Sequence, residues 1–262
     1  MVNVKKYGEW PFSVAVVHGG PGMSGEMAPV ALALSAYYGV LEPLQTVSSL
    51  EGQVEELKLV LIHNGALPMI LVGHSWGAWL AFILAARYPE LVKKLILVGS
   101  GPFKAEYAKQ IMETRLKRLN DQDKLAAQAL LDELNKAPLA SPGALKKLGK
   151  LFFKTDSYNP FPEVTEAIQA QPDIYQKVWP EADELRNSGQ LLELGKEISC
   201  PVVAIHGDYD PHPKDGVKVP LAAVVKDFKF INLAKCGHYP WMEKEARDKF
   251  YEILVKELGF IN

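Results

Sequence analysis

The sequence predicts an α/β protein, in which a mostly parallel β-sheet carries helices on both faces and a large helical insertion interrupts the sheet. Short apolar segments rich in β-branched residues alternate with segments of helical period along much of the chain, an order typical of parallel strands with crossover helices. Residues 103–197 break this alternation because they show helical patterns only. The 262 residues are 48% hydrophobic and 23% charged, which is typical of a globular chain with one sizeable core.

Five short apolar segments predict the strands of the sheet. Each is apolar at consecutive positions, as expected for a strand that is buried on both faces. They are Ser13–Val17, Met69–Gly73, Leu95–Gly99, Val202–His206 and Phe228–Leu233. Tyr38–Leu41 is a weaker candidate for a sixth strand. The sheet is therefore expected to draw on both ends of the chain.

Three segments between the strands predict the helices that cover the sheet. Leu50–Asn64 and Glu243–Leu258 each have one apolar stripe of helical period. Trp76–Tyr88 is apolar nearly all round, so we expect it to be a buried helix.

The helical insertion lies between two predicted strands. Its amphipathic segments are separated by turns such as SPG and NPFPE. The predicted helices are Glu106–Leu119, Asp123–Asn135, Gly143–Phe153 and Glu181–Leu194. We therefore expect a core made of residues 1–102 and 198–262, with residues 103–197 as a separate helical domain upon it.

Composition excludes several classes of partner. The formal net charge is −2 and no basic block occurs, so nucleic acid and anionic membranes are not expected partners. The first twelve residues lack the apolar stretch of a signal peptide, and no apolar stretch is long enough to span a membrane. The two cysteines, Cys200 and Cys236, have no metal-site spacing and suit a reducing compartment. These observations favour a cytoplasmic protein, and they carry no sign of its oligomeric state.

The motif GHSWG at residues 73–77 places Ser75 where a predicted strand turns into a predicted helix. A serine in G-x-S-x-G at such a junction is a candidate nucleophile, because the sharp turn lifts its hydroxyl clear of the sheet. Gly73 and Gly77 flank it because only tiny residues fit beside so tight a turn. The alternative is a glycine-rich turn with an incidental serine, which the strand and helix on either side make less attractive.

A nucleophilic serine needs a base and an acid that orients the base. His238 is the only histidine after residue 212 and follows the last predicted strand, so it is the expected base; His212 is a rival that lies close to the acidic loop. That loop, HGDYD at residues 206–210, offers both Asp208 and Asp210, and the residues alone do not choose between them. Asp215 is a third and more distant candidate.

The motif HGGPG at residues 18–22 follows the first strong strand. Attack on a carbonyl creates an oxyanion that needs preorganised N–H donors. Glycines let such a backbone approach the substrate closely. We predict the N–H groups of Gly20 and Trp76 as the two donors; the alternative for HGGPG is a plain Gly-Pro turn.

The four motifs HGGPG, GHSWG, HGDYD and GHYPW occur in the order that resembles the α/β-hydrolase superfamily. HGGPG together with GHSWG is most similar to the proline iminopeptidase branch, serine enzymes that remove N-terminal residues from peptides. The resemblance implies an α/β-hydrolase fold, Asp210 as the acid, and a cap over the site formed by residues 103–197. It departs from that branch at Pro211, where a carboxylate often holds the substrate's amino group; Glu163 and Glu166 are other candidates for that role.

The sequence thus predicts a serine hydrolase with the triad Ser75, Asp210 and His238. It should cleave an ester, amide or related acyl bond of a small, partly apolar substrate, with no cofactor and no metal. Trp241 and Trp179 are candidate substrate contacts. Proline iminopeptidase, carbon–carbon bond hydrolase and cofactor-free haloperoxidase activities remain alternatives. Epoxide hydrolase and haloalkane dehalogenase are disfavoured because they need aspartate at the position of Ser75. A ligand-binding receptor or interaction module on the same fold is the non-enzymatic alternative.

Overall fold

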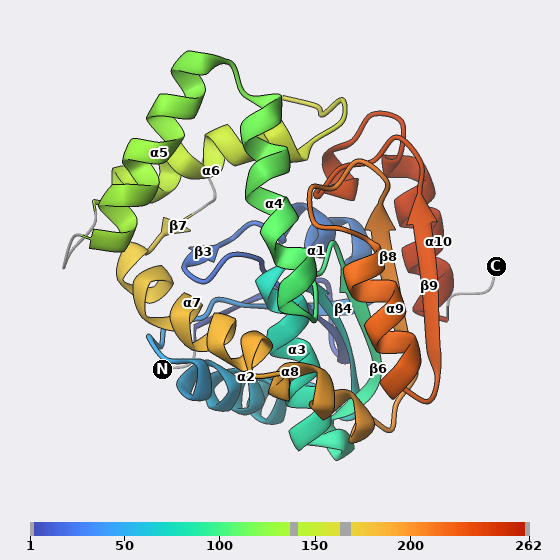
Figure 1. Cartoon of the computed structure of the whole chain (residues 1–262). Coiled ribbons are helices and arrows are strands. Elements are labelled where there is room, and N and C mark those ends of the chain that lie inside the picture. The colour runs from blue at the N-terminus through green and yellow to red at the C-terminus, as the bar shows by residue number, and fades with distance from the viewer. Residues whose placement is uncertain (1–2, 137–140, 163–168, 260–262) are drawn as a thin grey trace.

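A seven-stranded, mostly parallel sheet forms the centre of the molecule in the computed structural model, which describes residues 3–136, 141–162 and 169–259 (Figure 1). The strand order is β1-β4-β2-β5-β6-β8-β9, and only β1 runs antiparallel to its neighbour. The strands are β1 (Val4–Tyr7), β2 (Phe12–Val17), β4 (Gly39–Pro43), β5 (Met69–His74), β6 (Val92–Val98), β8 (Val202–Gly207) and β9 (Phe228–Leu233). The predicted fold class is confirmed.

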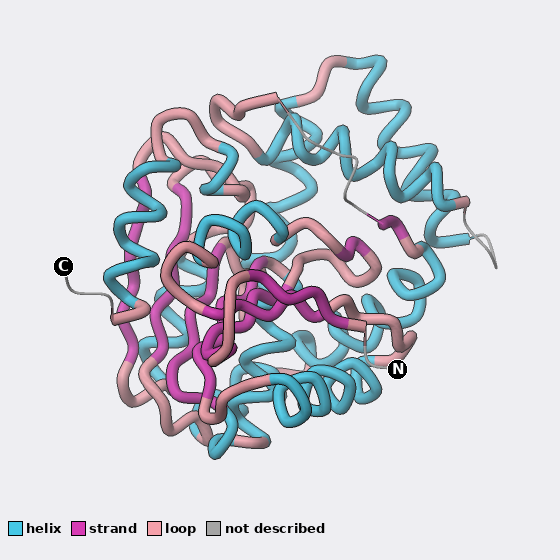
Figure 2. The backbone as a smooth tube through the Cα atoms, turned by 180° about the vertical axis from the view of Figure 1, so that it is seen from behind, coloured by secondary structure: helices cyan, strands magenta, loops and turns pink. Residues whose placement is uncertain are grey.

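Helices cover both faces of this sheet (Figure 2). One face packs against α2 (Leu50–Asn64), α3 (Trp76–Arg87) and α9 (Asp215–Val224), and the other against α1 (Ala28–Leu34) and α10 (Arg247–Glu257). Alternate residues of a strand serve the two faces: Ala15 and Val17 belong to the first apolar cluster, and Val14 and Val16 to the second. Because both faces are buried, the strands are apolar throughout, which is why they stood out in the sequence.

Five α-helices lie between β6 and β8 in the part of the chain that the structure describes. They are α4 (Ala105–Arg118), α5 (Asp121–Lys136), α6 (Pro142–Asp156), α7 (Pro172–Asn187) and α8 (Gln190–Glu193). We call residues 103–197 the helical insertion. Figure 1 shows α4, α5 and α6 at the end of the molecule toward which the arrowheads of β8 and β9 point.

The helical insertion has two kinds of contact with the rest of the chain. Helices α4, α5 and α6 pack around a small apolar cluster of their own, which includes Leu119 and Leu145. Helix α7 instead buries Ile174, Val178 and Ala182 in the core cluster beside α3. A two-stranded sheet, β3 (Met23–Ser24) with β7 (Gln169–Ala170), joins the insertion to the loop after β2.

The predicted strands are all present, and the weak candidate Tyr38–Leu41 corresponds to β4. Several elements were not predicted from the sequence, among them β1, α1, α9 and the two short strands β3 and β7. Pro220 lies inside α9, and an internal proline hides a helical pattern. The segment predicted as a helix over Glu181–Leu194 is the end of α7 followed by α8, and α7 also contains a proline, Pro180.

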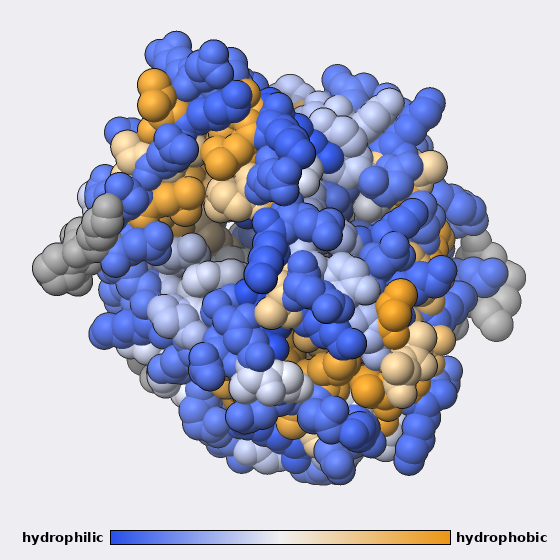
Figure 3. Space-filling model, viewed as in Figure 1, coloured by the Kyte–Doolittle hydropathy of each residue, from blue (hydrophilic) through white to orange (hydrophobic). Residues whose placement is uncertain are grey.

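The surface is mostly hydrophilic on the face shown in Figure 3, with hydrophobic side chains gathered around α5 and α6 and again around α8 and α9. Among the helices of the described residues, none combines the length and the apolar character that crossing a bilayer requires.

Candidate active site

Ser75 lies at the sharp turn from β5 into α3. Its backbone angles are φ 52° and ψ −115°, a left-handed conformation that a non-glycine residue adopts only under strain. A Cβ on Gly73 would lie 2.3 Å from the carbonyl oxygen of Gly77, and one on Gly77 would lie 2.2 Å from the carbonyl oxygen of Val17. The two glycines are therefore required by the close packing of the turn against the end of β2.

The HGGPG loop runs directly alongside this turn. A Cβ on Gly19 would lie 3.1 Å from the Cβ of Ser75 and 2.8 Å from the imidazole of His74, so the bare backbone of the loop faces the serine. Gly20 has φ +35°, and the loop closes with a hydrogen bond from the N–H of Met23 to its carbonyl. The N–H of Trp76 is the first of α3, where no preceding turn supplies an acceptor. Trp76 thus adjoins Ser75 in the chain, and Gly20 follows the glycine whose backbone faces the serine.

Asp210 is the acidic residue that contacts His238. The Nδ1 atom of His238 lies 2.7 Å from Oδ2 of Asp210, whereas Asp208 and Asp215 are exposed. Burial would raise the pKa of Asp210, but the charges of His238, His212 and His206 hold it well below the ordinary value. Burial likewise opposes protonation of His238, yet Asp210 outweighs burial and raises its pKa.

Within the described residues, no hydrogen bond joins Ser75 to His238. In unliganded hydrolases such bonds are often loose and tighten when substrate binds. The two residues are nevertheless linked through one neighbour: His212 lines the cavity that holds Ser75, and its ring stacks on that of His238 with centroids 4.3 Å apart.

His212 is a second imidazole on the same carboxylate. Its Nδ1 atom lies 2.7 Å from Oδ1 of Asp210, and its backbone N–H donates to the same oxygen at 2.9 Å. Burial lowers the pKa of His212 to about 4, so its ring is neutral at physiological pH. A neutral ring that donates through Nδ1 keeps Nε2 as an acceptor. Asp210 thus contacts two histidines whose pKa values are shifted in opposite directions: that of His212 is lowered and that of His238 is raised.

A second carboxylate–imidazole pair lies next to the first. Oε1 of Glu26 approaches Nδ1 of His74 to 2.5 Å, although not along the direction of a ring N–H hydrogen bond. The other ring nitrogen of His74 lies 3.0 Å from the carbonyl oxygen of His238. Burial would raise the pKa of Glu26, but the charge of His74 and contact with it lower the pKa. His74 therefore ties the loop after HGGPG to the loop that carries His238.

The helical insertion holds the loop that carries His238. The fully buried carboxylate of Glu243 accepts hydrogen bonds from the N–H groups of Gly237, Tyr158 and Asn159 at 2.7–2.8 Å. The backbone N–H of His238 donates to the carbonyl oxygen of Asp156 at 2.7 Å. These contacts fix the predicted base relative to the end of α6.

A cavity of about 180 Å³ contains Ser75, and we call it the Ser75 cavity. Core residues form one side of it and residues of the helical insertion the other. The core side includes Ser75, Trp76, Trp79 and His212, and the insertion side includes Arg115, Trp179 and Arg186. A substrate bonded to Ser75 would therefore lie between the core and the insertion.

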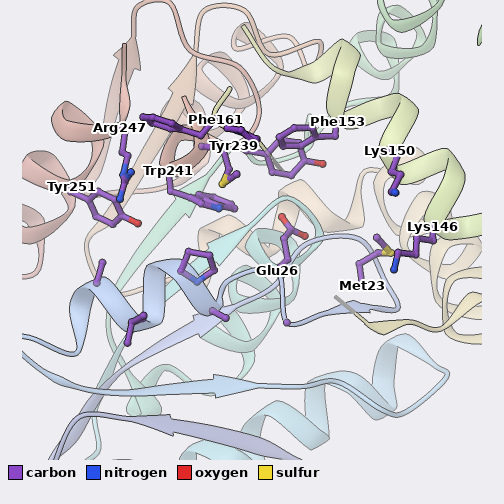
Figure 4. A pocket seen from close by; sticks show the side chains of 18 of the residues that line it. Met23, Glu26, Lys146, Lys150, Phe153, Phe161, Tyr239, Trp241, Arg247 and Tyr251 are labelled. Atoms are coloured by element: carbon purple, nitrogen blue, oxygen red, sulfur yellow. The ribbon is translucent and has the colours of Figure 1, made fainter. Parts of the chain in front are cut away.

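A larger cavity of about 700 Å³ is lined in part by residues that follow the HGGPG motif, and we call it the Glu26 cavity (Figure 4). Its wall is mainly apolar and includes Met23, Phe153, Phe161, Tyr239 and Trp241, with Lys146, Lys150 and Arg247 as cations. Figure 4 shows the Glu26 carboxylate between Trp241 and Met23. Neither Ser75 nor His238 lines this cavity.

The predicted substrate contacts fall in different cavities. Trp179 lines the Ser75 cavity and stacks on Trp79 with ring centroids 6.2 Å apart. Trp241 lines the Glu26 cavity and packs against His74. Glu163 and Glu166 lie outside the described residues.

Several residues of the site were not singled out from the sequence, among them Glu26, Arg115, Arg186 and Glu243. The only signal for Glu243 is its position five residues after His238, and the two arginines sit on amphipathic helices that contain many other charges.

One group of side chains among the described residues has a spacing that could hold a metal ion. The ligand atoms of Asp210, His212 and His238 lie within 4.8 Å of one another. Both imidazoles already bond Asp210 through Nδ1, so hydrogen bonding accounts for this grouping.

Comparison with known proteins places this geometry in context. Residues 46–245 match the family model described as alpha/beta hydrolase fold. Protein ABHD8 of Mus musculus is 27% identical over 158 residues, which are 60% of this chain but only 32% of that protein. The chain therefore spans about a third of the length of the ABHD8 proteins it matches.

A second relative matches over more of the chain. The 2-hydroxy-6-oxononadienedioate/2-hydroxy-6-oxononatrienedioate hydrolase of Paraburkholderia xenovorans is 24% identical over 226 residues, covering 80% of this chain and 66% of that protein. Among solved structures, VinJ superposes with a TM-score of 0.66 at 17% identity, covering 97% of this chain and 93% of VinJ. At that identity the likeness concerns the fold alone.

Proposed function

The chain belongs to the alpha/beta hydrolase fold family, and we propose that it is a serine hydrolase that cleaves an ester, amide or related acyl bond of a small substrate. The observation that carries this proposal is the conjunction at one edge of the sheet. A strained serine at the β5–α3 turn lies beside a bare glycine loop, and a buried Asp210–His238 pair follows the last two strands. These are the parts that acyl transfer needs.

The reaction would proceed in two halves. Oγ of Ser75 bonds to the carbonyl carbon while its proton passes to Nε2 of His238, and the resulting oxyanion accepts hydrogen bonds from the N–H groups of Gly20 and Trp76. The bond to the leaving group then breaks, and His238 gives the proton to that group. Water next adds to the acyl carbon with His238 as base, which releases the acid and restores Ser75.

Asp210 supports this cycle through charge and orientation. Its contact with Nδ1 of His238 leaves Nε2 as the reacting nitrogen, and its negative charge stabilises the imidazolium that forms. In this proposal the helical insertion acts as a cap, because it contributes Arg115, Trp179 and Arg186 to the lining of the Ser75 cavity.

The test is covalent labelling together with turnover. A fluorophosphonate should modify the native protein at Ser75, and Ser75→Ala should lose both labelling and hydrolysis of short p-nitrophenyl esters by a factor on the order of 10⁵ or more. Ser100→Ala is the matched control, because Ser100 follows the neighbouring strand β6 and its hydroxyl donates a hydrogen bond to the carbonyl of Gly101. Equal turnover by Ser75→Ala and the native protein would overturn the proposal.

A carbon–carbon bond hydrolase is the second candidate. It has one specific observation in its favour, the similarity to the Paraburkholderia hydrolase over 80% of this chain. The same residues would serve it, since only the leaving group differs. The ester-hydrolysis assay and a vinylogous diketone substrate measured side by side would rank the two activities.

The aminopeptidase alternative finds less support among the described residues. Pro211 follows the acid, and the Ser75 cavity is lined by two arginines, which repel a protonated amine. A receptor or interaction module is distinguished by the labelling experiment, since a pure binding protein would not react with a fluorophosphonate at Ser75.

A further inference from the structure

We propose that the Ser75 cavity selects substrates whose acyl group carries a carboxylate, which is bound by Arg186 with the support of Arg115. This inference rests on the proposed serine hydrolase function and names its substrate class. The acyl group is the part concerned, because it stays bonded to Ser75 after the leaving group departs.

The first observation is the charge of the cavity wall. Arg115 on α4 and Arg186 on α7 both line the cavity that contains Ser75, and no aspartate or glutamate is among the described residues of its wall. The side chain of Arg115 is 14% exposed and that of Arg186 is 8% exposed. The charged side chains that line the cavity are therefore of one sign, although each is paired with an aspartate outside the lining. Such a lining favours ligands of the opposite sign.

The second observation is how each arginine is held. Arg115 donates Nε and Nη2 to Asp156, which is fully buried, and Arg186 donates Nη2 to Asp183. Neither carboxylate lines the cavity. Both guanidinium groups are therefore held by carboxylates that lie outside the cavity lining. A guanidinium that is held in place in this way loses little freedom when it binds a planar carboxylate through two N–H groups.

The third observation is that Arg186 is incompletely satisfied. Its Nε atom is buried and finds no hydrogen-bond partner among the described residues. Burial lowers the pKa of Arg186, although Asp183 opposes this shift, because a charge that is kept out of water is unfavourable. An unsatisfied buried donor on a charged group is costly. Arg186 lines the cavity, and in this proposal its guanidinium turns toward a substrate carboxylate, which supplies the missing acceptor.

The remaining wall sets the size and shape of the acyl group. Trp76, Trp79 and Trp179 provide flat apolar surfaces, and the guanidinium of Arg186 lies 5.6 Å from the ring centroid of Trp79. At about 180 Å³ the cavity is only slightly larger than one of about 150 Å³ that accommodates benzene. The fitting substrate is therefore a short dicarboxylic half-ester rather than a fatty acyl ester.

The decisive experiment compares two esters of equal chain length: the mono-p-nitrophenyl ester of glutaric acid, which is anionic, and p-nitrophenyl pentanoate, which is neutral. We expect the native protein to favour the anionic ester in kcat/KM by about 10- to 100-fold, the range for a hydrogen bond to a charged group. Arg186→Gln should bring the ratio of the two kcat/KM values close to one, because the anionic ester loses the guanidinium that binds its carboxylate. Arg186→Lys should retain part of the preference for the anionic ester, because lysine keeps the positive charge but lacks the paired N–H groups of the guanidinium.

Arg87→Gln is the matched control, since it removes the same charge from an exposed ion pair outside both cavities and should leave the ratio unchanged. Glutarate and pentanoate as competitive inhibitors of the native protein give a second measurement that does not depend on the stability of a variant, and glutarate should bind more tightly.

The outcomes separate this inference from the function on which it rests. Hydrolysis of neither ester would refute the serine hydrolase. Hydrolysis of both esters at similar rates, with glutarate no better than pentanoate as an inhibitor, would overturn the anionic substrate and leave the hydrolase standing. A preference that survives in Arg186→Gln would overturn the assignment to Arg186.

Discussion

Two carboxylate–imidazole pairs with little solvent exposure lie side by side at the carboxyl end of the sheet, and only one of them has the features of a catalytic pair. Asp210 contacts His238, and Glu26 contacts His74, while the two imidazole rings are 4.7 Å apart. Each pair combines a lowered carboxylate pKa with a histidine at the end of a strand or the start of a loop. Contact distance and burial alone do not distinguish them.

The difference lies in the second nitrogen of each ring. Nε2 of His74 lies within hydrogen-bond distance of the carbonyl oxygen of His238, and Nδ1 contacts Glu26. Both nitrogens of His74 therefore face groups of neighbouring loops. His238 contacts Asp210 through Nδ1. Its Nε2 atom has no hydrogen bond to any described residue. A base needs a free nitrogen that faces the reacting proton. A buried ion pair next to a nucleophile is therefore a sign of catalysis only when one partner keeps an open position.

Asp210→Asn should have the largest effect on this comparison. The amide cannot stabilise an imidazolium and favours the wrong tautomer of His238, so we expect kcat to fall by about 10⁴-fold with the fold intact. Because Asp210 is what raises the pKa of His238 against burial, the acid limb of the residual kcat/KM profile should move to lower pH. The measurement is a pH–rate profile with a short p-nitrophenyl ester.

Asp208→Asn is the control for that experiment. Asp208 lies two residues away in the same loop, is exposed, and accepts a 3.2 Å hydrogen bond from the N–H of Cys236. We expect less than about a threefold change in kcat/KM, the size typical of a surface substitution. Comparable losses in the two variants would mean that the loop, and not the carboxylate of Asp210, is what matters.

Glu26→Gln should have an intermediate effect that appears in stability rather than in chemistry. Removing the charge opposite His74 should cost about 1–3 kcal/mol of unfolding free energy at pH 7, while kcat/KM falls by about tenfold or less because Glu26 touches no reacting atom. Urea denaturation of the variant and the native protein measures the first quantity.

The pH dependence of that loss has a definite sign. His74 lowers the pKa of Glu26 below its ordinary value of 4.5, so the stabilisation is present above pH 4.5 and disappears as the pH falls through the pKa of the folded protein. The stability difference between Glu26→Gln and the native protein should therefore shrink in acid. A catalytic loss as large as that of Asp210→Asn would erase the distinction between the two pairs.

The sequence predicts the parts of the site that follow strands directly. Ser75, Asp210 and His238 each come within a few residues of a strand end, where parallel topology brings side chains to one edge. The choice between Asp208 and Asp210 required either the resemblance or the structure. Side chains alternate regularly between two faces in a strand but not in a loop, so the sequence does not show which aspartate points toward His238. Arg115 and Arg186 lie on helices of the insertion, and the way these helices pack on the core has no local signature. Glu26 is one of many acidic residues until His74 is seen beside it.

The smallest predicted effect concerns His212, which shares Asp210 with His238. Its Nδ1–H donates to Oδ1 of the carboxylate at 2.7 Å and so draws negative charge away from His238. His212→Phe keeps the stacked ring and removes the donor. The pKa of His238 should then rise further, and the acid limb of kcat/KM should move up by about half a pH unit, which is about a threefold loss near pH 6 and none at pH 9. His212→Asn, which places an amide donor near the position of Nδ1, should restore the native profile. A limb that stays in place in His212→Phe would show that Asp210 serves His238 alone, and would make His212 a wall of the Ser75 cavity rather than part of the pair.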